Sequence, residues 1–433
     1  MCGIAGLIKK NSYLNNIDKS KILELMNSRG PDDNGFFTSK TKNCKIDLFH
    51  SRLAIIDTQK RSRQPFKYKN LTLVYNGEIY NFKEIRNELK KNGYIFNTES
   101  DTEVVIKAYD KWKEKCVKKF DGMWSICIFD QKKEEVFLSR DPFGEKPLFY
   151  YLDSSKFIFG SEIKYILKLD SQNHDLKKIN FNQIDLYLKQ GYKFLNKKNH
   201  TFFKNIFKFD SGTYALLNLN TFRIIKKKFL KKKGYDLERP ISYKDAVLKT
   251  KKLVIETLGS RLISDVPIGF YLSGGVDSGS LASIATKVYN QKITCFSIID
   301  KDQRYNEEKN VDKVTNDLNC NTIKINFPQK HDFFERLDKL VDYHDSPIAT
   351  PSYYTHSFIH DEVKKYNIKV LISGLGGDEI FSGYFDHYLM HLKEIEKDKK
   401  NYNKNLDNWK KYILPYIRNK NLRDLNFFKN KKN

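Results

Sequence analysis

The second residue of the chain is a cysteine, in the opening MCGIAGL. Removal of Met1 would leave Cys2 with a free α-amino group beside its thiol, so that one residue would carry both a nucleophile and a base. Chance offers an alternative explanation, because cysteine is also a small and often buried hydrophobic residue. The opening therefore raises a catalytic hypothesis that the rest of the chain has to support.

A glycine-rich stretch, YLSGGVDSGS, lies between an apolar strand pattern and a helix pattern. The small residues Ser273, Gly274 and Gly275 allow a turn whose backbone N–H groups converge on an anion, and the following helix adds its dipole. Ser278 lies in the first helical turn, and Asp277 is a candidate ligand for Mg²⁺ between phosphate oxygens. The stretch is not a Walker phosphate loop, and an ordinary strand-to-helix turn is the alternative.

A second stretch, KVLISGLGGDEIFSGY, repeats the layout of strand, glycine-rich turn and acidic pair. Parallel strands deliver their loops to the same edge of a sheet, so Asp378 and Glu379 would face Asp277 across one site. Two such loops predict a nucleotide-binding site rather than two unrelated turns. The complete SGGVDS pattern resembles the pyrophosphate loop of ATP pyrophosphatases, which activate a carboxylate or an amide by adenylation.

The first half of the chain has the pattern of short strands separated by turns. β-Branched and aromatic residues concentrate in each strand segment, which is typical of a sheet-dominated α+β domain. Two segments with apolar residues at helical spacing add helices. The expected strands are 71–76, 124–130, 135–140, 147–152 and 156–161, and the expected helices are 84–92 and 101–116.

From residue 241 the pattern changes to helices that alternate with apolar strands, which is typical of an α/β domain with a parallel sheet covered on both faces. The sequence before it is rich in Lys and Asn. We expect one domain at 1–210, a linker at 211–240 and a second domain at 241–433. In the second domain the expected helices are 244–262, 278–289, 307–318, 331–343 and 352–366, and the expected strands are 268–273, 292–298, 322–327 and 369–373.

The composition is that of a globular protein with two domains, at 433 residues, 40% hydrophobic and 30% charged. No apolar run approaches the roughly 18 residues of a membrane span, and no signal peptide is recognisable. Six scattered cysteines without a CxxC pair indicate a reduced, cytoplasmic protein. The net charge of +25 comes from lysines spread over the whole chain without a nucleic-acid motif. We therefore expect neither nucleic acid nor a membrane as a partner.

The first half also carries five polar motifs, RGPDD, HSRLAIID, VYNGEIYNF, ESDTEV and SRDPFGEKPLFY. Taken singly, each is explained by a turn or a helix cap. Together with MCGI, and in this order and spacing, they resemble the class II glutamine amidotransferase domain. With SGGVDS and SGLGGDE the resemblance extends from Met1 to Tyr384, and the chain is similar to the family of glutamine-hydrolysing asparagine synthetases.

The resemblance implies a four-layer αββα N-terminal-nucleophile domain that hydrolyses glutamine. Cys2 would attack the side-chain amide of glutamine, with its own α-amino group as the base. Asn76 and the N–H of Gly77 match the oxyanion hole of the family. The residues that match glutamine-binding positions are Arg52 for the carboxylate, Glu78 and Asp101 for the amino group, and Leu53, Ala54, Ile55, Ile56, Asn76 and Gly77 around them.

For the second half the resemblance implies an ATP- and Mg²⁺-dependent synthetase site, which ammonia reaches through a tunnel between the domains. Aspartate would be activated as its adenylate and converted to asparagine, with release of AMP and pyrophosphate. Asp277 and Asp378 would hold Mg²⁺. The residues that match ATP-binding positions are Leu272, Ser273, Gly274, Gly275, Asp277, Ser278, Ile298, Ser373 and Gly374.

Two features depart from the family pattern. Leu375 stands where the family carries a glutamate implicated in adenylate formation, which leaves open another carboxylate acceptor, for example in a cell-surface sugar or secondary-metabolite pathway. Family members also continue well past Tyr384 with segments that are not recognisable here, so we expect the synthetase half to be incomplete at its C-terminal end. A glutaminase fused to a nucleotide-binding module that completes no synthesis is therefore a further alternative. An RNA-modifying pyrophosphatase would need an RNA-binding appendage, and none is recognisable in the sequence. The sequence leaves open whether the protein forms a homodimer.

Overall fold

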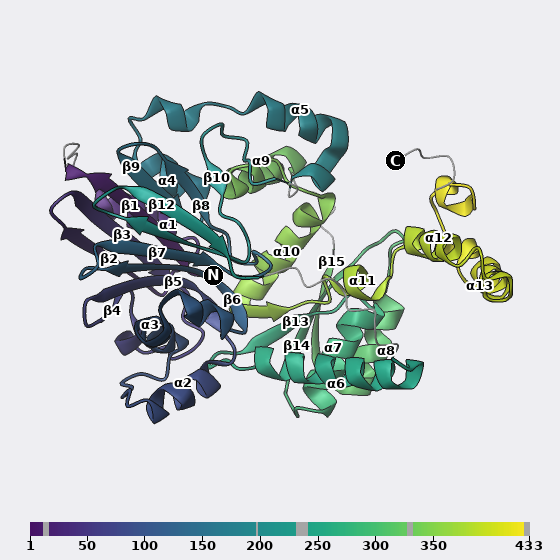
Figure 1. Cartoon of the computed structure of the whole chain (residues 1–433). Coiled ribbons are helices and arrows are strands. Elements are labelled where there is room, and N and C mark those ends of the chain that lie inside the picture. Colours follow the sequence, from purple (N-terminus) through teal and green to yellow (C-terminus); the bar gives the residue numbers. More distant parts are fainter. Residues whose placement is uncertain (12–16, 196–197, 231–240, 327–331, 428–433) are drawn as a thin grey trace. The chain divides into compact units, whose positions relative to one another are not determined.

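The structure is a computed structural model, which describes residues 1–11, 17–195, 198–230, 241–326 and 332–427 (Figure 1). The chain divides into two compact units. The first unit comprises Met1–Gly269 and Ile325–Leu371, and the second comprises Phe270–Lys324 and Ile372–Asn433.

The first unit contains two six-stranded sheets. The strand order of one is β10-β8-β9-β1-β3-β2, and that of the other is β12-β11-β7-β6-β5-β4. Neighbouring strands in both sheets are antiparallel, including β1 with β3 and β5 with β6. The strands of the first sheet are β1 (Gly3–Lys10), β2 (Asp33–Lys40), β3 (Cys44–Arg52), β8 (Phe149–Leu152), β9 (Lys156–Gly160) and β10 (Phe207–Lys208); those of the second are β4 (Phe66–Tyr68), β5 (Leu71–Ile79), β6 (Gly122–Asp130), β7 (Glu135–Arg140), β11 (Thr213–Asn218) and β12 (Arg223–Lys228).

Three hydrophobic clusters arrange these sheets and four helices into layers. One cluster lies between the sheets, where Ile4 and Leu48 meet Val74 and Phe129. A second packs α1 (Lys19–Met26) and α4 (Ile163–Leu169) on the outer face of the first sheet. A third packs α2 (Phe82–Lys91) and α3 (Asp101–Trp112) on the outer face of the second sheet (Figure 1). The unit is thus an αββα sandwich, which confirms the predicted fold class.

Local sequence explains the helices that flank the second sheet. In α2 the buried residues Phe82, Ile85 and Leu89 recur at helical spacing on one face. At the start of α3, the hydroxyl of Ser100 accepts a hydrogen bond from the N–H of Thr102 at 3.1 Å, which satisfies one of the free N–H groups of the first turn.

The segment predicted as a linker contains two strands. β11 pairs with β7, and β12 pairs with β11 at the edge of the second sheet. The lysines of RIIKKK in β12 are exposed, and lysines on an edge strand discourage pairing with other chains. Their density explains why this strand reads as a linker in the sequence. Residues 231–240 of the predicted linker lie outside the described residues.

The first unit also includes helices from later in the chain. They are α5 (Phe181–Gln190), α6 (Tyr243–Arg261), α9 (Phe333–His344) and α10 (Pro351–Lys365). Within the described part of the chain, no helix combines the length and apolar character that crossing a membrane requires.

A four-stranded parallel sheet in the order β15-β14-β13-β16 organises the second unit, as the alternation of strands and helices predicts. β14 and then β15 are added on one side of β13, whereas β16 is added on its other side. The order in which strands are added therefore reverses between β13 and β16. Ligands of such sheets bind beyond the carboxyl ends of the strands at this reversal. The elements are β13 (Ile268–Tyr271), α7 (Val276–Lys287), β14 (Thr294–Ile299), α8 (Glu308–Leu318), β15 (Asn321–Asn326), β16 (Val370–Ile372), α11 (Gly377–Phe381), α12 (Phe385–Glu394) and α13 (Lys399–Tyr412).

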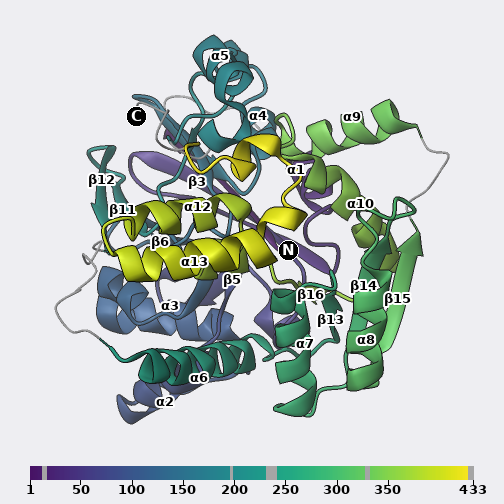
Figure 2. The same cartoon turned by 90° about the vertical axis from the view of Figure 1, so that its right-hand side faces the viewer.

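The last two helices of the second unit, α12 and α13, lie side by side (Figure 2). Their contact buries Leu389, Leu392 and Trp409, and Ile417 joins the same cluster. This cluster shares no residue with the other clusters described above, so the end of the chain has a small core of its own.

Candidate active sites

Cys2 precedes β1, and its thiol meets the backbone that follows β3. The thiol accepts a hydrogen bond from the N–H of Leu53 at 3.3 Å and donates to the carbonyl of the same residue at 3.6 Å. The Nε of Arg29 donates to the carbonyl oxygen of Cys2 at 2.9 Å. Burial raises the pKa of the Cys2 thiol, although the Leu53 N–H opposes this. The thiol therefore needs a base to become a nucleophile.

The terminal amino group is the candidate for this base. With Met1 in place, its ammonium donates to the carbonyl oxygen of Arg29 at 3.1 Å. Burial lowers the pKa of this Met1 group to about 5. The amine of Cys2 becomes terminal only after Met1 is removed, and it would then take the thiol proton within its own residue.

A pocket opens on the Cys2 thiol. It brings together most of the residues that the sequence associates with glutamine, together with four that it did not single out. Ala54 and Asn76 are not among its walls, since the N–H of Ala54 donates to a carboxylate oxygen of Asp32 at 2.7 Å and Asn76 is only 1% exposed. The lining residues are Cys2, Arg52, Leu53, Ile55, Ile56, Gln64, Tyr75, Gly77, Glu78, Ser100, Asp101 and Thr102.

Arg52 is held in place by backbone carbonyls. One of its terminal nitrogens donates to the carbonyl of Gln59 at 2.8 Å, and the other donates to the carbonyl of Asp57. Its guanidinium is nearly buried and has no carboxylate within ion-pair distance among the described residues. A fixed guanidinium of this kind suits a bidentate pair with the carboxylate of a substrate.

Two carboxylates, those of Glu78 and Asp101, also line the pocket. Burial raises the pKa of Glu78 well above its ordinary range, and the neighbouring Asp101 carboxylate raises it further. Burial also raises the pKa of Asp101, although hydrogen bonds from the N–H of Ile79 at 3.0 Å and the hydroxyl of Tyr75 at 2.8 Å oppose this. The Oε2 of Glu78 is buried without a hydrogen-bond partner among the described residues. This pair therefore suits a bound ammonium group, which would supply the missing partner.

Asn76 and Gly77 lie near the end of β5, and Gly77 lines the pocket together with Cys2. The side-chain Nδ2 of Asn76 is buried without a hydrogen-bond partner among the described residues. A Cβ on Gly77 would run into the carbonyl oxygen of Met123, so only glycine fits there. An amide N–H without a partner and a backbone N–H in the adjacent residue are donors of the kind that stabilise the oxyanion of a tetrahedral intermediate.

Sequence reasoning missed Gln64, Tyr75 and Lys146. Lys146 is 6% exposed; burial lowers its pKa, while Glu78 and Cys2 raise it. The motif SRDPFGEKPLFY contains Lys146, but nothing in that pattern marks this lysine as part of the Cys2 surroundings. The contacts of Gln64 and Tyr75 depend on the pairing of strands and have no signal in the sequence.

In the second unit, the two glycine-rich loops touch. A Cβ on Gly374 would lie 2.8 Å from the backbone nitrogen of Ser278, and one on Gly377 would collide with the Asp277 carboxylate. The first loop is held by Ser278, whose hydroxyl accepts from the N–H of Ser273 at 3.2 Å. The predicted adjacency of the two loops is therefore present, at neighbouring strands β13 and β16.

The donor set at these loops fits Mg²⁺ bound through a nucleotide. Within the described residues no group of three or more His, Cys, Asp and Glu gathers to hold a metal ion. Mg²⁺ in nucleotide sites needs only one or two carboxylates, with phosphates and water as the other ligands. Asp277 and Asp378, each at the start of a helix after a glycine-rich turn, provide those two carboxylates.

The remaining predicted nucleotide residues lie on or beside the same strands. Leu272 is buried, and its N–H donates to the carbonyl of Phe296 in β14 at 2.9 Å. Ile298 is half-buried in β14, and Ser373 follows β16. Leu375 is 75% exposed in the second loop. Its side chain is therefore open to solvent where the family pattern has a glutamate.

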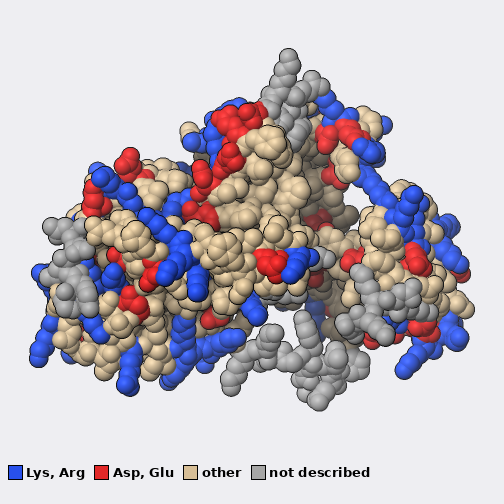
Figure 3. Space-filling model, turned by 90° about the horizontal axis from the view of Figure 1, so that it is seen from above, with Lys and Arg blue, Asp and Glu red and all other residues tan. Residues whose placement is uncertain are grey.

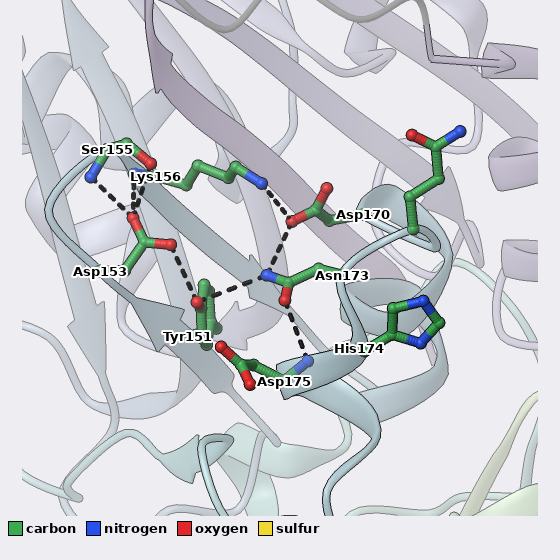
Figure 4. A pocket seen from close by; sticks show the side chains of 9 residues that line it. Tyr151, Asp153, Ser155, Lys156, Asp170, Asn173, His174 and Asp175 are labelled. Atoms are coloured by element: carbon green, nitrogen blue, oxygen red, sulfur yellow. Dashed lines mark hydrogen bonds and ion pairs between the residues drawn. The ribbon is translucent and has the colours of Figure 1, made fainter.

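A further pocket, in the first unit, is lined by polar side chains that bind one another (Figure 4). The Asp153 carboxylate accepts from the backbone N–H groups of Ser155 and Lys156 at 2.7 Å each and from the Tyr151 hydroxyl at 2.8 Å. The ammonium of Lys156 pairs with Asp170 at 2.7 Å. These groups satisfy one another and fasten the β8–β9 hairpin, so the pocket is explained by the fold.

The basic side chains do not form one stripe on the face drawn in Figure 3. Lys and Arg occur there in separate groups, with Asp and Glu between them. At the edge strand β12, Lys226 donates to the hydroxyl of Tyr150 at 2.6 Å.

Comparison with known families gives two matches along the chain. Residues 1–230 match the family described as glutamine amidotransferase domain, and residues 249–428 match the family described as asparagine synthase. The first match covers the sandwich that contains Cys2, and the second covers both glycine-rich loops.

Two curated relatives resemble the chain over most of its length. A Methanocaldococcus jannaschii protein, named provisionally as asparagine synthetase (glutamine-hydrolyzing) 2, is 34% identical over 89% of this chain and 76% of its own. Asparagine synthetase (glutamine-hydrolyzing) 1 of Bacillus subtilis is 30% identical over 89% of this chain and 59% of its own. Among solved structures, the glutamine phosphoribosylpyrophosphate amidotransferase of B. subtilis aligns over 67% of this chain and 65% of its own, with a TM-score of 0.37 at 16% identity.

Proposed function

The chain belongs to the family of glutamine-hydrolysing asparagine synthetases, and on this basis we propose that it makes asparagine from aspartate, using ATP and the amide nitrogen of glutamine. The observation that supports the glutamine half most strongly is the pocket at Cys2, whose lining includes a guanidinium, Arg52, and two carboxylates, Glu78 and Asp101. We take 1–210 as the glutaminase domain and 241–433 as the synthetase domain of this proposal.

The glutaminase step needs only groups of this chain. After removal of Met1, the Cys2 amine takes the thiol proton, and the sulfur attacks the amide carbon of glutamine. The Asn76 side chain and the Gly77 N–H stabilise the oxyanion, and the C–N bond then breaks with proton transfer to ammonia. Water hydrolyses the resulting thioester to glutamate and restores the thiol. Arg52, Glu78 and Asp101 hold the two charged groups of the substrate.

For the synthetase step, the loops after β13 and β16 would hold the phosphates of ATP. Ser273, Gly274, Gly275 and Ser278 offer N–H and hydroxyl donors, and the helix α7 adds its dipole. Mg²⁺, held through Asp277 and Asp378, would neutralise phosphate charge. The acceptor carboxylate is activated as its adenylate with release of pyrophosphate, and ammonia then displaces AMP.

A second candidate is an amidotransferase of the same mechanism that acts on a carboxylate other than aspartate. Leu375 favours it, because an exposed leucine stands where the family carries a glutamate. The chain spans 59% of the length of the B. subtilis relative named above and 63% of a second one. A glutaminase with a nucleotide-binding module that completes no synthesis is a third candidate.

One experiment separates these candidates. Purified protein is incubated with ATP, Mg²⁺ and glutamine labelled with ¹⁵N in the side-chain amide, and with a panel of carboxylates that includes aspartate. The main proposal would be supported if aspartate is the only carboxylate of the panel that gives pyrophosphate release, and if labelled asparagine is formed from it. Pyrophosphate release with another carboxylate would support the second candidate. Glutamate formation without acceptor-dependent pyrophosphate release would support the third.

A further inference from the structure

Tyr75, one residue before Asn76, has both backbone groups bound by side chains from other strands and loops. Its N–H donates to the Oε1 of Gln64 at 2.6 Å. Its carbonyl accepts from the Nε2 of His50 at 3.1 Å. Both side chains are nearly or fully buried. This double hold is unusual, because backbone groups inside a sheet normally bind a neighbouring strand.

β4 is the strand that pairs with this edge of β5, but it does not extend as far as Tyr75. It pairs with β5 only from Tyr68↔Leu71 to Phe66↔Leu73, whereas β5 continues to Ile79. In an antiparallel ladder the N–H and C=O of alternate residues point to the same side. The backbone groups of Tyr75 and Gly77 therefore point to the edge that β4 has left. Gln64 and His50 occupy that edge at Tyr75, and the Gly77 N–H points to the same edge, where Gly77 lines the Cys2 pocket.

His50 connects the two sheets at this point. It belongs to β3 of the first sheet, and its ring reaches Tyr75 in β5 of the second sheet. Arg52, two residues after His50, lies on the same side of β3, because side chains alternate along a strand. This hydrogen bond thus links the strand that carries Arg52 to the strand that carries Asn76 and Gly77.

The protonation of His50 suits this role. Burial lowers the pKa of its ring to about 3, so the ring is neutral near neutral pH. The Tyr75 carbonyl can only accept, so the single ring proton resides on Nε2. The Nδ1 atom has no hydrogen-bond partner among the described residues. A neutral ring therefore donates one bond, and that bond goes to Tyr75.

We propose that His50 and Gln64 are positioning residues for the oxyanion hole, which replace a neighbouring strand at Tyr75 and so fix Asn76 and Gly77 against the Cys2 thiol. Neither touches the reacting atoms through these bonds. The inference rests on the proposed glutaminase function. A displaced oxyanion hole stabilises the transition state less, but it changes the binding of the substrate amide only slightly. We therefore expect kcat to fall while KM stays nearly constant.

The test uses two pairs of variants of the full chain. His50→Leu removes the donor, and His50→Gln keeps a donor at a similar reach. Gln64→Leu removes the acceptor, and Gln64→Glu keeps it. We expect each Leu variant to lower the kcat of glutamine hydrolysis by about 30- to 100-fold, with KM within about 3-fold of the unmodified protein. In each conservative variant, we expect at least about a third of the loss in log kcat to be recovered.

The control variant is Val74→Ala. Val74 is fully buried in β5 next to Tyr75 and packs between the sheets, so its truncation disturbs the core without removing a bond to Tyr75. We expect its kcat to stay within about 3-fold of the unmodified protein. The rate at which iodoacetamide alkylates Cys2, followed by mass spectrometry of the Cys2 peptide, should be nearly the same in all variants, because alkylation forms no oxyanion.

The proposal is wrong if folded Leu variants keep kcat within about 2-fold, if KM rises as much as kcat falls, or if neither conservative variant recovers activity. Because the two pairs act on Tyr75 from different sides, folding failure of one pair leaves the other to decide. Absence of glutamine hydrolysis in the unmodified protein would instead overturn the proposed function itself, before any variant is compared.

Discussion

The two candidate sites of this chain are built in opposite ways. The Cys2 site is made of buried side chains on strands and at the start of α3, where Arg52 is 6%, Asn76 1% and Asp101 4% exposed. The second site is made of two loops at the ends of strands. Leu272 and Ser278 are buried there, but several side chains in and beside these loops are open to solvent, with Val276 84%, Leu375 75% and Ile380 75% exposed.

The difference follows from what each site has to bind. The reacting group of glutamine is a neutral amide, so charge develops only in the transition state and has to meet donors that are already in place. A nucleotide brings several negative charges with it, and backbone N–H groups, a helix dipole and Mg²⁺ can gather around them. The first site therefore depends on side chains fixed by their neighbours, and the second depends on small residues that let the backbone approach.

The largest effect should come from the nucleophile of the buried site. Cys2→Ala should lower glutamine hydrolysis by at least about 10³-fold, because no other group beside the pocket can form the thioester. Pyrophosphate release with free ammonium as nitrogen donor should stay within about 3-fold. Both rates are measured on the same preparation. Continued use of glutamine as nitrogen donor by this variant would show that Cys2 is not the nucleophile.

The converse change belongs to the loop site. Asp277→Asn should lower acceptor-dependent pyrophosphate release by about 10²-fold or more, since a carboxylate that would hold Mg²⁺ is lost. Glutamine hydrolysis without ATP should remain within about 2-fold. Ser280→Ala, in the next turn of α7, serves as the control for the helix itself. If Asp277→Asn lost both activities equally, the assignment of Asp277 to a separate nucleotide site would be wrong.

A smaller effect concerns the buried carboxylate pair. Glu78→Gln should raise the KM for glutamine by about 10-fold, because one of two partners of the substrate ammonium is lost. In the unmodified protein the raised pKa values of Glu78 and Asp101 mean that these groups take up protons at a higher pH than ordinary carboxylates. The binding form is ionised, so KM should rise as the pH is lowered from about 8 to about 6.

Steady-state kinetics of glutamine hydrolysis across this pH range measure the effect. The slope of log KM against pH should flatten in Glu78→Gln. A KM that is independent of pH in the unmodified protein would contradict the assignment of these carboxylates to the substrate ammonium.

The smallest effect is on stability. Glu78→Gln should increase the free energy of unfolding near neutral pH by about 1–3 kcal/mol, because a buried carboxylate without a hydrogen-bond partner is replaced by a neutral amide. A carboxyl whose pKa is raised on folding stabilises the fold when protonated and loses that contribution as the pH rises through its folded value. The gain of the variant should therefore shrink as the pH falls. Urea unfolding at several pH values measures it, with Glu84→Gln, in the first turn of α2, as the exposed control.

Much of the fold can be predicted from local patterns. The segments 71–76 and 135–140 are recognised as strands by their β-branched and aromatic residues, and β5 and β7 contain them. β12, within the predicted linker 211–240, is not recognised, because it is an edge strand rich in lysine and lacks the alternation that marks a half-buried strand.

The candidate site is predictable where chemistry is tied to a short motif. Cys2 at the second position, Asn76 and Gly77 in VYNGEIYNF, and Asp277 in SGGVDS are each visible as a pattern. The positioning contacts are not. The bonds of His50 and Gln64 to Tyr75 join residues 25 and 11 positions apart, through a gap that exists only because β4 is short.

The sequence by itself determined the types of reacting groups, the alternation of elements and the presence of two sites of different character, because these depend on residue identity and on periodicities of two and 3.6 residues. Only the tertiary structure decided which polar atoms are left without partners inside the Cys2 pocket and which strand edge stays open beside Gly77. Those properties depend on burial and on the lengths of paired strands, and both are set by contacts between distant parts of the chain.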